Sequence, residues 1–267
     1  MSWSAKQYVA FEDERTRPVR DLLGALPPIN VRSARSVGPP GAAPSVIDLG
    51  CGPGNSTEVL AAFYPQAHVA GFDSSEDMIK AARARLPHIG FSVQDLQTWA
   101  DPGPFDVILA NAVLQWVPGH EVLLPALIAK LAPGGSLAVQ MPDNLDEPAH
   151  RMMREVAAAG PWASKLAAAA QARVPLADAR WYYALLRPLC ARVDLWRTTY
   201  YHSLAGAGAV VEWFKGSGLR PYLEPLNGAE RSAYLERYTA EISKIYVPAA
   251  DGNVLLPFPR VFLAATR

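Results

Sequence analysis

The chain has few cysteines and no excess of charge of either sign. Its 267 residues include only Cys51 and Cys190, which cannot build a disulfide framework and do not have metal-ligand spacing. Lys and Arg together number 25, as do Asp and Glu, so no global field would hold nucleic acid or an anionic membrane. These shortages argue against a disulfide-rich protein, a metal site and a nucleic-acid partner, although a local basic cluster remains open.

Long apolar runs are also missing. No stretch of about 18 apolar residues occurs, and charged side chains stand near the N-terminus where a signal peptide would need an apolar segment. The composition, 50% hydrophobic and 19% charged, is typical of a globular protein rather than a disordered one. We expect a cytoplasmic protein, with no membrane and no obligate protein partner implied.

The most informative stretch is residues 46–55, V-I-D-L-G-C-G-P-G-N. An apolar run ends in glycines at alternate positions and then changes to a helical pattern, which predicts a strand, a tight loop and a helix start. Alternate glycines let the backbone approach a ligand, and the helix N-terminus offers N–H donors. The stretch predicts a nucleotide-like cofactor, with contacts from Asp48, Gly50, Gly52 and Asn55.

The acidic residue beside this loop separates two kinds of cofactor. In the dinucleotide pattern G-x-G-x-x-G the third glycine would fall at Asn55, whereas this loop reads G-x-G-x-G and is preceded by Asp48. A carboxylate there repels a pyrophosphate but suits a ligand with an ammonium and a sulfonium. The loop resembles that of class I S-adenosylmethionine-dependent methyltransferases. Other Rossmann-like binders and non-catalytic relatives are the alternatives.

Strand and helix patterns alternate from residue 46 to 141. This order predicts an α/β fold, a Rossmann-like doubly wound sheet that is mostly parallel. A helix over 4–26, bent or split at Pro18, and a linker to residue 45 precede it. The expected strands are 46–49, 68–72, 90–94, 105–111 and 136–141; the expected helices are 55–64, 76–86 and 120–131, with a turn at 133–135.

Beyond residue 141 the alternation weakens. Short helices are expected over 143–176, a helix over 180–189, a strand over 190–204 and amphipathic helices over 206–247. The last strand, 254–265, should run antiparallel and lack regular pairing before Val261 because of Pro257 and Pro259. The predicted organisation is an N-terminal helix and linker at 1–45, a cofactor-binding core at 46–142, a helical lid at 143–176 and 205–247, and the remaining helix and strands of the core sheet at 177–204 and 248–267.

Polar residues end the expected parallel strands. Asp73 ends the second strand about 20 residues beyond the glycine loop, where a carboxylate can accept both ribose hydroxyls; a cap of the next helix is the alternative. After the third strand, Asp95 could face the adenine amino group and Leu96 could cover the ring, with a solvated turn as the alternative. Asn111 ends the fourth. Because ligands bind outside the carboxyl ends of parallel strands, these residues should converge on one crevice.

Several segments outside the cofactor loop are informative. They are N-A-V-L-Q-W at 111–116, Q-M-P-D-N at 140–144, W-R-T-T-Y-Y-H at 196–202, F-P-R at 258–260, and Tyr8, Phe11 and E-R-T-R-P at 14–18. With these segments the chain resembles the trans-aconitate 2-methyltransferase family over nearly its full length, and it departs from that family in the loop 31–45 and the Ala-rich stretch 159–174. The resemblance implies transfer of one methyl group from S-adenosylmethionine to a carboxylate of trans-aconitate or a near analogue, giving a monomethyl ester and S-adenosylhomocysteine.

The same resemblance implies site residues. Trp116 and Gln115 would hold the reacting carboxylate, although Trp116 could instead be a core residue. Arg17, Ser74 and Met78 would add cofactor contacts. The implied substrate residues are Tyr8, Arg197, Tyr200, Tyr201, His202 and Arg260.

The chemistry of these residue types agrees with a carboxylate acceptor. Arginine is suited to bidentate carboxylate recognition, with a plain surface charge as the alternative for Arg197 and Arg260. A carboxylate is ionised above about pH 5, so the reaction would need no general base. His202 is therefore expected to donate a hydrogen bond rather than to remove a proton.

Other function classes remain open. A nucleic-acid methyltransferase would be expected to carry N/D-P-P-Y after the fourth strand, but the chain reads N-A-V-L there and has zero formal net charge. A methyltransferase of another small molecule, or a non-catalytic cofactor-binding protein of the same fold, would have the same cofactor residues. No metal is predicted.

Overall fold

The computed structural model describes residues 12–29, 43–173 and 175–267. The chain forms two compact units. Unit 1 comprises Met1–Met141, Leu176–Arg197 and Val261–Arg267, and unit 2 comprises Pro142–Pro175 and Thr198–Arg260. The predicted helix before residue 12, with Tyr8 and Phe11, and most of the predicted linker, residues 30–42, lie outside the described residues.

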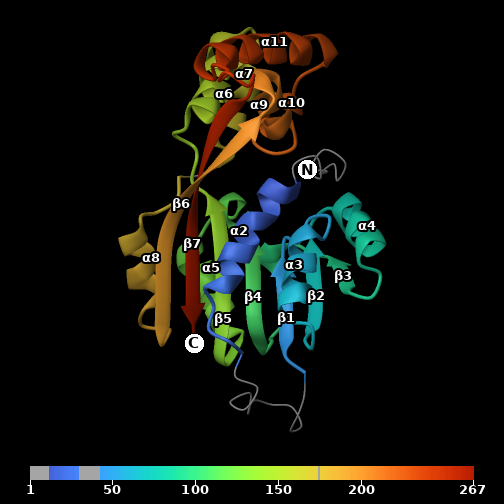
Figure 1. Cartoon of the computed structure of the whole chain (residues 1–267), viewed down its shortest axis with the longest axis vertical. Coiled ribbons are helices and arrows are strands. Elements are labelled where there is room, and N and C mark those ends of the chain that lie inside the picture. Colours follow the sequence, from blue (N-terminus) through green and yellow to red (C-terminus); the bar gives the residue numbers. More distant parts are fainter. Residues whose placement is uncertain (1–11, 30–42, 174) are drawn as a thin grey trace. The chain divides into compact units, whose positions relative to one another are not determined.

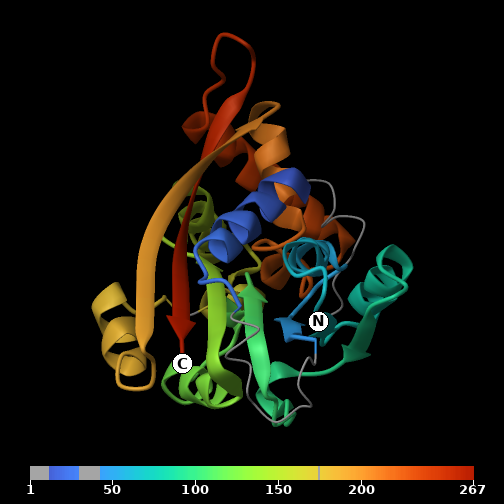
Figure 2. The ribbon, with the colours of Figure 1, turned by 60° about the horizontal axis from the view of Figure 1, so that its bottom comes forward.

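A seven-stranded sheet confirms the predicted α/β class, with the strand order β3-β2-β1-β4-β5-β7-β6 (Figure 1). The first five strands pair in parallel, and the last strands are antiparallel. The turned view in Figure 2 shows β6 and β7 as the longest arrows of the ribbon. The strands are β1 (Ser45–Leu49), β2 (His68–Asp73), β3 (Gly90–Val93), β4 (Phe105–Asn111), β5 (Leu131–Pro142), β6 (Arg192–Leu204) and β7 (Val254–Thr266).

Helices connect the parallel strands where the helical periodicity predicts them. They are α3 (Asn55–Phe63), α4 (Glu76–Arg85) and α5 (His120–Ala129), and α8 (Ala179–Leu186) packs on α5. The central strand β4 is an apolar run whose residues 107–110 are buried, as expected for a strand covered on both faces. This arrangement places the carboxyl ends of β1, β2 and β4 beside one another.

The helix that contains Pro18 is continuous. α2 spans Glu12–Gly24 with the proline inside it, so the helix is not split there, and the alternative of a bend at Pro18 stays a prediction. Proline removes one intrahelical hydrogen bond, but Val19, Leu22 and Leu23 are fully or almost fully buried on the same helix. The packing of this apolar face outweighs the lost bond.

The predicted turn at 133–135 lies inside a strand. β5 begins at Leu131, and its register against β4 shifts between Phe105 and Val107, which marks a bulge. The bulge is held by the C-terminal residue: Gly134 N donates to Arg267 O at 3.0 Å, and Arg267 N donates to Gly135 O at 3.0 Å. Pairing with a distant segment thus converts turn-forming residues into strand.

The prolines of the last strand do not delay its start. β7 runs from Val254 to Thr266, so the prediction of irregular pairing before Val261 was wrong. Proline lacks only the N–H donor, and its carbonyl still accepts: Asp143 N donates to Pro259 O at 2.9 Å.

Unit 2 consists mainly of helices beside the ends of β6 and β7. The helices α6 and α11 lie side by side (Figure 1), because Tyr234 and Tyr238 of α11 donate to the carbonyls of Met153 and Ala149 at 3.0 and 3.2 Å. Asn227 and Glu230 form a capping box at the start of α11. The unit contains α6 (Pro148–Ala159), α7 (Ala163–Leu166), η3 (Ala169–Gln171), α9 (Gly206–Lys215), α10 (Arg220–Leu223) and α11 (Gly228–Ile245).

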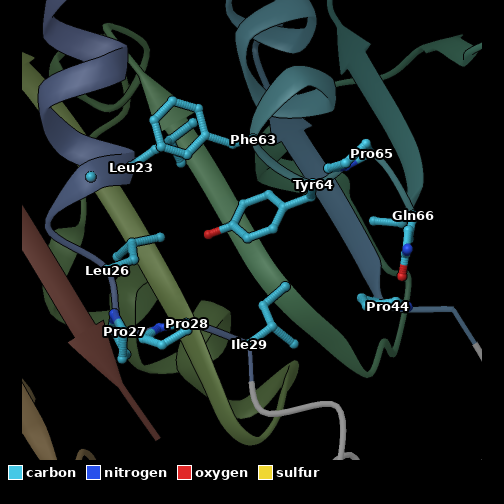
Figure 3. Close-up of a pocket in the computed structure, with 12 residues that line it drawn as sticks. Leu23, Leu26, Pro27, Pro28, Ile29, Pro44, Phe63, Tyr64, Pro65 and Gln66 are labelled. Atoms are coloured by element: carbon cyan, nitrogen blue, oxygen red, sulfur yellow. The ribbon is translucent and has the colours of Figure 1, made fainter.

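An apolar groove of about 450 Å³ lies in unit 1 near the end of α2. Pro44 and Ala67, which line it, directly precede β1 and β2, so the groove lies at the amino end of the sheet. Figure 3 shows the Tyr64 hydroxyl pointing across it toward Leu26. Because cofactors of this sheet type bind at the carboxyl ends of the strands, the groove is separate from the predicted site.

Among the helices of the described ranges, none combines the length and apolar character needed to cross a bilayer.

Replacing Gly135 by alanine should destabilise the protein by about 1–3 kcal/mol, because overpacking against a fixed backbone forces the strands apart. A Cβ at this position would lie 2.7 Å from Phe105 O and 3.0 Å from Ala132 O. Gly228→Ala is the matched control, since its Cβ would meet nothing within 4 Å. Urea unfolding of both variants tests this, and equal stabilities would contradict the role of the bulge.

Candidate functional site

The glycine loop after β1 has a left-handed backbone at its glycines. The φ angles of Gly50 and Gly52 are +62° and +55°. A Cβ on Gly50 would lie 2.5 Å from Cγ2 of Val113, so this glycine permits a close approach of the loop to the chain after β4. At Gly52 a Cβ would meet nothing within 4 Å, which leaves room for a ligand against the backbone.

Asp48 is buried beneath this loop. Its Oδ2 accepts hydrogen bonds from the hydroxyls of Ser56 and Thr57, both at 2.7 Å, at the start of α3. Burial raises the pKa of Asp48 to about 7; the two hydroxyls oppose this shift, and the nearby Asp73 adds to it. The carboxylate therefore joins the end of β1 to α3 across the loop. Ser56 and Thr57 were not singled out from the sequence, although hydroxyl residues in a first helical turn are a usable signal.

Asp73 joins the loop to the next helix. Its Oδ2 accepts from Gly52 N at 3.0 Å, and its Oδ1 accepts from Ser75 N at 2.9 Å. Burial raises the pKa of Asp73, and these backbone donors oppose the rise. The cap of α4 is Ser75, whose hydroxyl accepts from Met78 N at 3.5 Å. Asp73 is thus placed at the carboxyl end of β2, in direct contact with the glycine loop.

The predicted adenine residues occupy different environments. Asp95 is exposed, and its carboxylate accepts from Gln97 N at 2.9 Å at the start of η1 (Leu96–Thr98). Leu96 and Met78 are buried, and Leu96 belongs to the main core cluster. Ser74 is exposed at the end of β2.

The chain after β4 carries backbone strain. Ala112 has φ +55°, a left-handed conformation that is unfavourable by about 1–2 kcal/mol for an L-residue with a side chain. Two hydrogen bonds hold it there: Ala112 N donates to Gln140 O at 2.8 Å, and Gln115 Nε2 donates to Ala112 O at 2.6 Å. Trp116 follows, half-buried, at the end of η2 (Leu114–Trp116). No pattern in the sequence marks Ala112 as strained.

Four buried polar atoms at this end of the sheet have no hydrogen-bond partner among the described residues. They are three acceptors, Oδ1 of Asp48, Oδ1 of Asn111 and Oε1 of Gln115, and one donor, Nδ2 of Asn55. Each such atom is unfavourable by about 1–3 kcal/mol unless a ligand or water satisfies it. The pairing of Leu49 with Ala110 brings the strands that carry Asp48 and Asn111 together. Three acceptors and one donor fit a ligand that has an ammonium group and a carboxylate.

Three of the predicted substrate residues, Tyr200, His202 and Arg260, are buried around Phe258 in unit 2. The Arg260 guanidinium carbon lies 4.5 Å from the Phe258 ring centroid and 5.9 Å from that of Tyr200. The His202 ring stacks on Trp213 with centroids 4.6 Å apart. Tyr201 is 67% exposed, because neighbouring strand residues face opposite sides.

The remaining predicted arginines are exposed in unit 1. Arg197 is exposed on β6. Arg17 is exposed on α2 and lies 4.0 Å from Asp21, an ordinary surface ion pair. The neighbouring Arg15, in contrast, is buried on the same helix.

Comparisons with known proteins agree with this geometry. A family model described as a methyltransferase domain matches residues 11–195. A trans-aconitate 2-methyltransferase of Rhodopseudomonas palustris strain BisB18 is 53% identical over 99% of both chains. Proteins of the same name from Methylobacterium nodulans and Azoarcus sp. strain BH72 are 52% and 50% identical, covering 99% and 100% of this chain and 98% and 99% of their own.

Solved structures share the fold at low identity. The YcgJ protein of Bacillus subtilis matches with a TM-score of 0.55 and 12% identity, covering 92% of this chain and 98% of its own. A putative methyltransferase of Bacillus halodurans matches with a TM-score of 0.51 and 14% identity, covering 88% and 96%. The full-length similarity to the relatives above is far more specific, and the chain therefore belongs to the methyltransferase-domain family and, within it, to the trans-aconitate 2-methyltransferase family.

Proposed function

We propose that this chain transfers a methyl group from S-adenosylmethionine to a carboxylate of a small polycarboxylic acid, with trans-aconitate, the acid named in its relatives, as the acceptor. The observation that carries the cofactor assignment is the set of buried polar atoms near the ends of β1 and β4 that find no hydrogen-bond partner within the described part of the chain. The acceptor assignment is supported by relatives of that name at about half identity over the whole chain and by the buried Arg260 in unit 2.

The cofactor would be held mainly by its charged and hydroxyl groups. Oxygens of Asp48, Asn111 and Gln115 would accept from its ammonium, and Asn55 would donate to its carboxylate. Asp73 keeps further lone pairs beyond the two backbone bonds and would accept from the ribose. The predicted adenine contacts of Asp95 and Leu96 remain predictions.

Gln115 fits the cofactor better than the reacting carboxylate. Its donor nitrogen is engaged by Ala112 O at 2.6 Å, so the atom that faces no partner is an acceptor oxygen. An acceptor would repel a carboxylate and attract an ammonium. We therefore assign Trp116 alone, through its indole N–H, to the reacting carboxylate.

For this reaction the protein mainly has to align the carboxylate with the methyl group. When bound, the cofactor would supply a methyl group attached to a positively charged sulfur. The carboxylate oxygen would bond to the methyl carbon, and the electron pair of the broken carbon–sulfur bond would stay on the sulfur. No proton moves, so no base is required. Trp116 would orient the reacting carboxylate, while Tyr200, His202, Arg197 and Arg260 would bind the rest of the acid. Alignment of this kind can supply about 7–11 kcal/mol of the barrier.

A radiolabelled methyl-transfer assay with a panel of acids tests the proposal. Trans-aconitate should be methylated with a kcat/KM at least about tenfold above that of crotonate, a monocarboxylate, because remote binding energy orients the reacting group. The product should be a methyl ester, which mild alkali hydrolyses. Methylation of a non-carboxylate alone would favour another small-molecule methyltransferase, and cofactor binding without turnover of any acceptor would favour a non-catalytic protein.

Asp73→Asn should weaken binding of S-adenosylhomocysteine about 10- to 150-fold, the range for hydrogen bonds to a charged group. Asp77→Asn is the matched control, since Asp77 is an exposed acid in the first turn of α4. Isothermal titration calorimetry gives both affinities. Unchanged affinity in Asp73→Asn would remove this carboxylate from the site.

Cofactor affinity should fall as the pH drops below about 7. The pKa of Asp48 is about 7 without ligand, so its carboxyl group is increasingly protonated below that pH. An ammonium beside it favours the ionised form, and binding must then release a proton, which weakens affinity by up to about tenfold per pH unit. Titrations of S-adenosylhomocysteine between pH 5.5 and 8, in buffers of different ionisation enthalpy, measure affinity and proton release together. Asp48→Asn should bind more weakly, with neither effect; a pH-independent affinity in the parent would contradict the assignment.

A further inference from the structure

We propose that Arg173 is a specificity-determining residue that, together with Arg260, binds the two carboxylates of the acceptor that do not react. The inference rests on the proposed function and deepens it. Arg173 lies in the Ala-rich stretch where the chain departs from the family resemblance, and no motif marks it. Its role is indicated by its hydrogen bonds and by its link to the segment that carries Arg260, both within unit 2.

Arg173 is fixed by two neutral oxygens. Its Nη1 donates to Oδ1 of the buried Asn144 at 3.0 Å, and its Nη2 donates to Pro142 O at 2.8 Å. These bonds hold the planar guanidinium in one orientation. A guanidinium that is oriented beforehand loses less entropy when it binds a carboxylate than a mobile surface arginine does.

The same short segment leads to Arg260. Asp143, between the two residues that Arg173 contacts, donates its N–H to Pro259 O at 2.9 Å. Arg260 follows directly and is 3% exposed, with its guanidinium over the ring of Phe258. The half-buried Arg173 and the buried Arg260 are thus anchored on one pair of hydrogen-bonded segments, 142–144 and 259–260.

Arg173 is a cation at neutral pH. Burial lowers the pKa of Arg173 to about 10, which leaves it cationic at neutral pH, and Asp143 and Tyr222 oppose the shift. Burial and the charges of Arg173 and Arg154 hold the pKa of His150 well below its usual value, so this histidine is neutral there. A carboxylate ligand beside Arg173 would be attracted by this positive charge, in addition to Asp143.

The number of arginines matches the number of spare carboxylates. Trans-aconitate carries three carboxylates, of which one receives the methyl group. Each of the other two can pair with one guanidinium, and such charge-assisted bidentate pairs are the strong ones. Arg173 should therefore matter for a tricarboxylate and not for a monocarboxylate.

The test compares Arg173→Met with Arg231→Met. Arg231 is the matched control, because its guanidinium also contacts two backbone carbonyls in unit 2, those of Leu223 and Leu226, at 3.2 and 3.3 Å. Binding of trans-aconitate is measured by calorimetry on enzyme saturated with S-adenosylhomocysteine, and turnover is measured with trans-aconitate and crotonate. We expect Arg173→Met to weaken trans-aconitate binding about 10- to 150-fold, with crotonate kcat/KM and cofactor affinity within about twofold of the parent. Arg231→Met should change none of these.

Equal losses for both acids, or no loss for trans-aconitate, would overturn the inference. If the parent enzyme binds trans-aconitate through Arg173 but methylates no acid, the proposed function alone is overturned. If the parent enzyme does not bind trans-aconitate, the inference about Arg173 is overturned. If Arg173→Met fails to fold, Arg173→Lys decides the matter: it keeps the charge without the bidentate fork, so trans-aconitate binding should fall while crotonate turnover is kept. Equal effects of this variant on both acids would count against the inference.

Discussion

The buried carboxylate of Asp48 is the constraint on which the cofactor end of the sheet depends. It bonds the hydroxyls of Ser56 and Thr57 on the far side of the glycine loop and so fixes where α3 begins relative to β1. Removing this group from water favours its neutral form, which explains its raised pKa. The same burial prepares it for a cationic ligand, since an ammonium beside it would restore the favourable charged state.

Two further contacts fix the glycine loop against neighbouring strands. Asp73 binds Gly52 N, which ties the loop to β2, and the close approach of Gly50 to Val113 ties it to the chain after β4. The strained backbone of Ala112 lies at this same point, held by Gln140 O. Strain of this kind persists only where surrounding bonds over-determine it, and it concentrates at ligand sites. The ends of β1, β2 and β4 therefore fix the geometry of the predicted cofactor site together.

The buried polar cluster of unit 2 is built on an arginine rather than on a carboxylate. Around Phe258 a buried cation is packed among aromatic rings: the Arg260 guanidinium lies over Phe258, near the stacked rings of His202 and Trp213. Rings and neutral oxygens position a guanidinium while leaving its charge intact. Such a cation is suited to recognise carboxylates, whereas the acidic residues around the glycine loop are suited to a cationic cofactor.

The sequence by itself determined the parallel strands and their helices, the glycine loop, and the acidic residue at the end of β2, because these follow from local periodicity and turn chemistry. Tertiary structure decided what those residues contact. Whether Pro18 breaks a helix, or Pro257 and Pro259 interrupt a strand, depends on the packing and pairing available, and the bulge in β5 depends on the distant Arg267. Arg173 acquires its partners 29 and 31 residues away in the chain. The buried polar atoms that lack a hydrogen-bond partner in the described ranges could not be predicted from the sequence either, because burial results from the packing of segments far apart in sequence, and no local pattern encodes it.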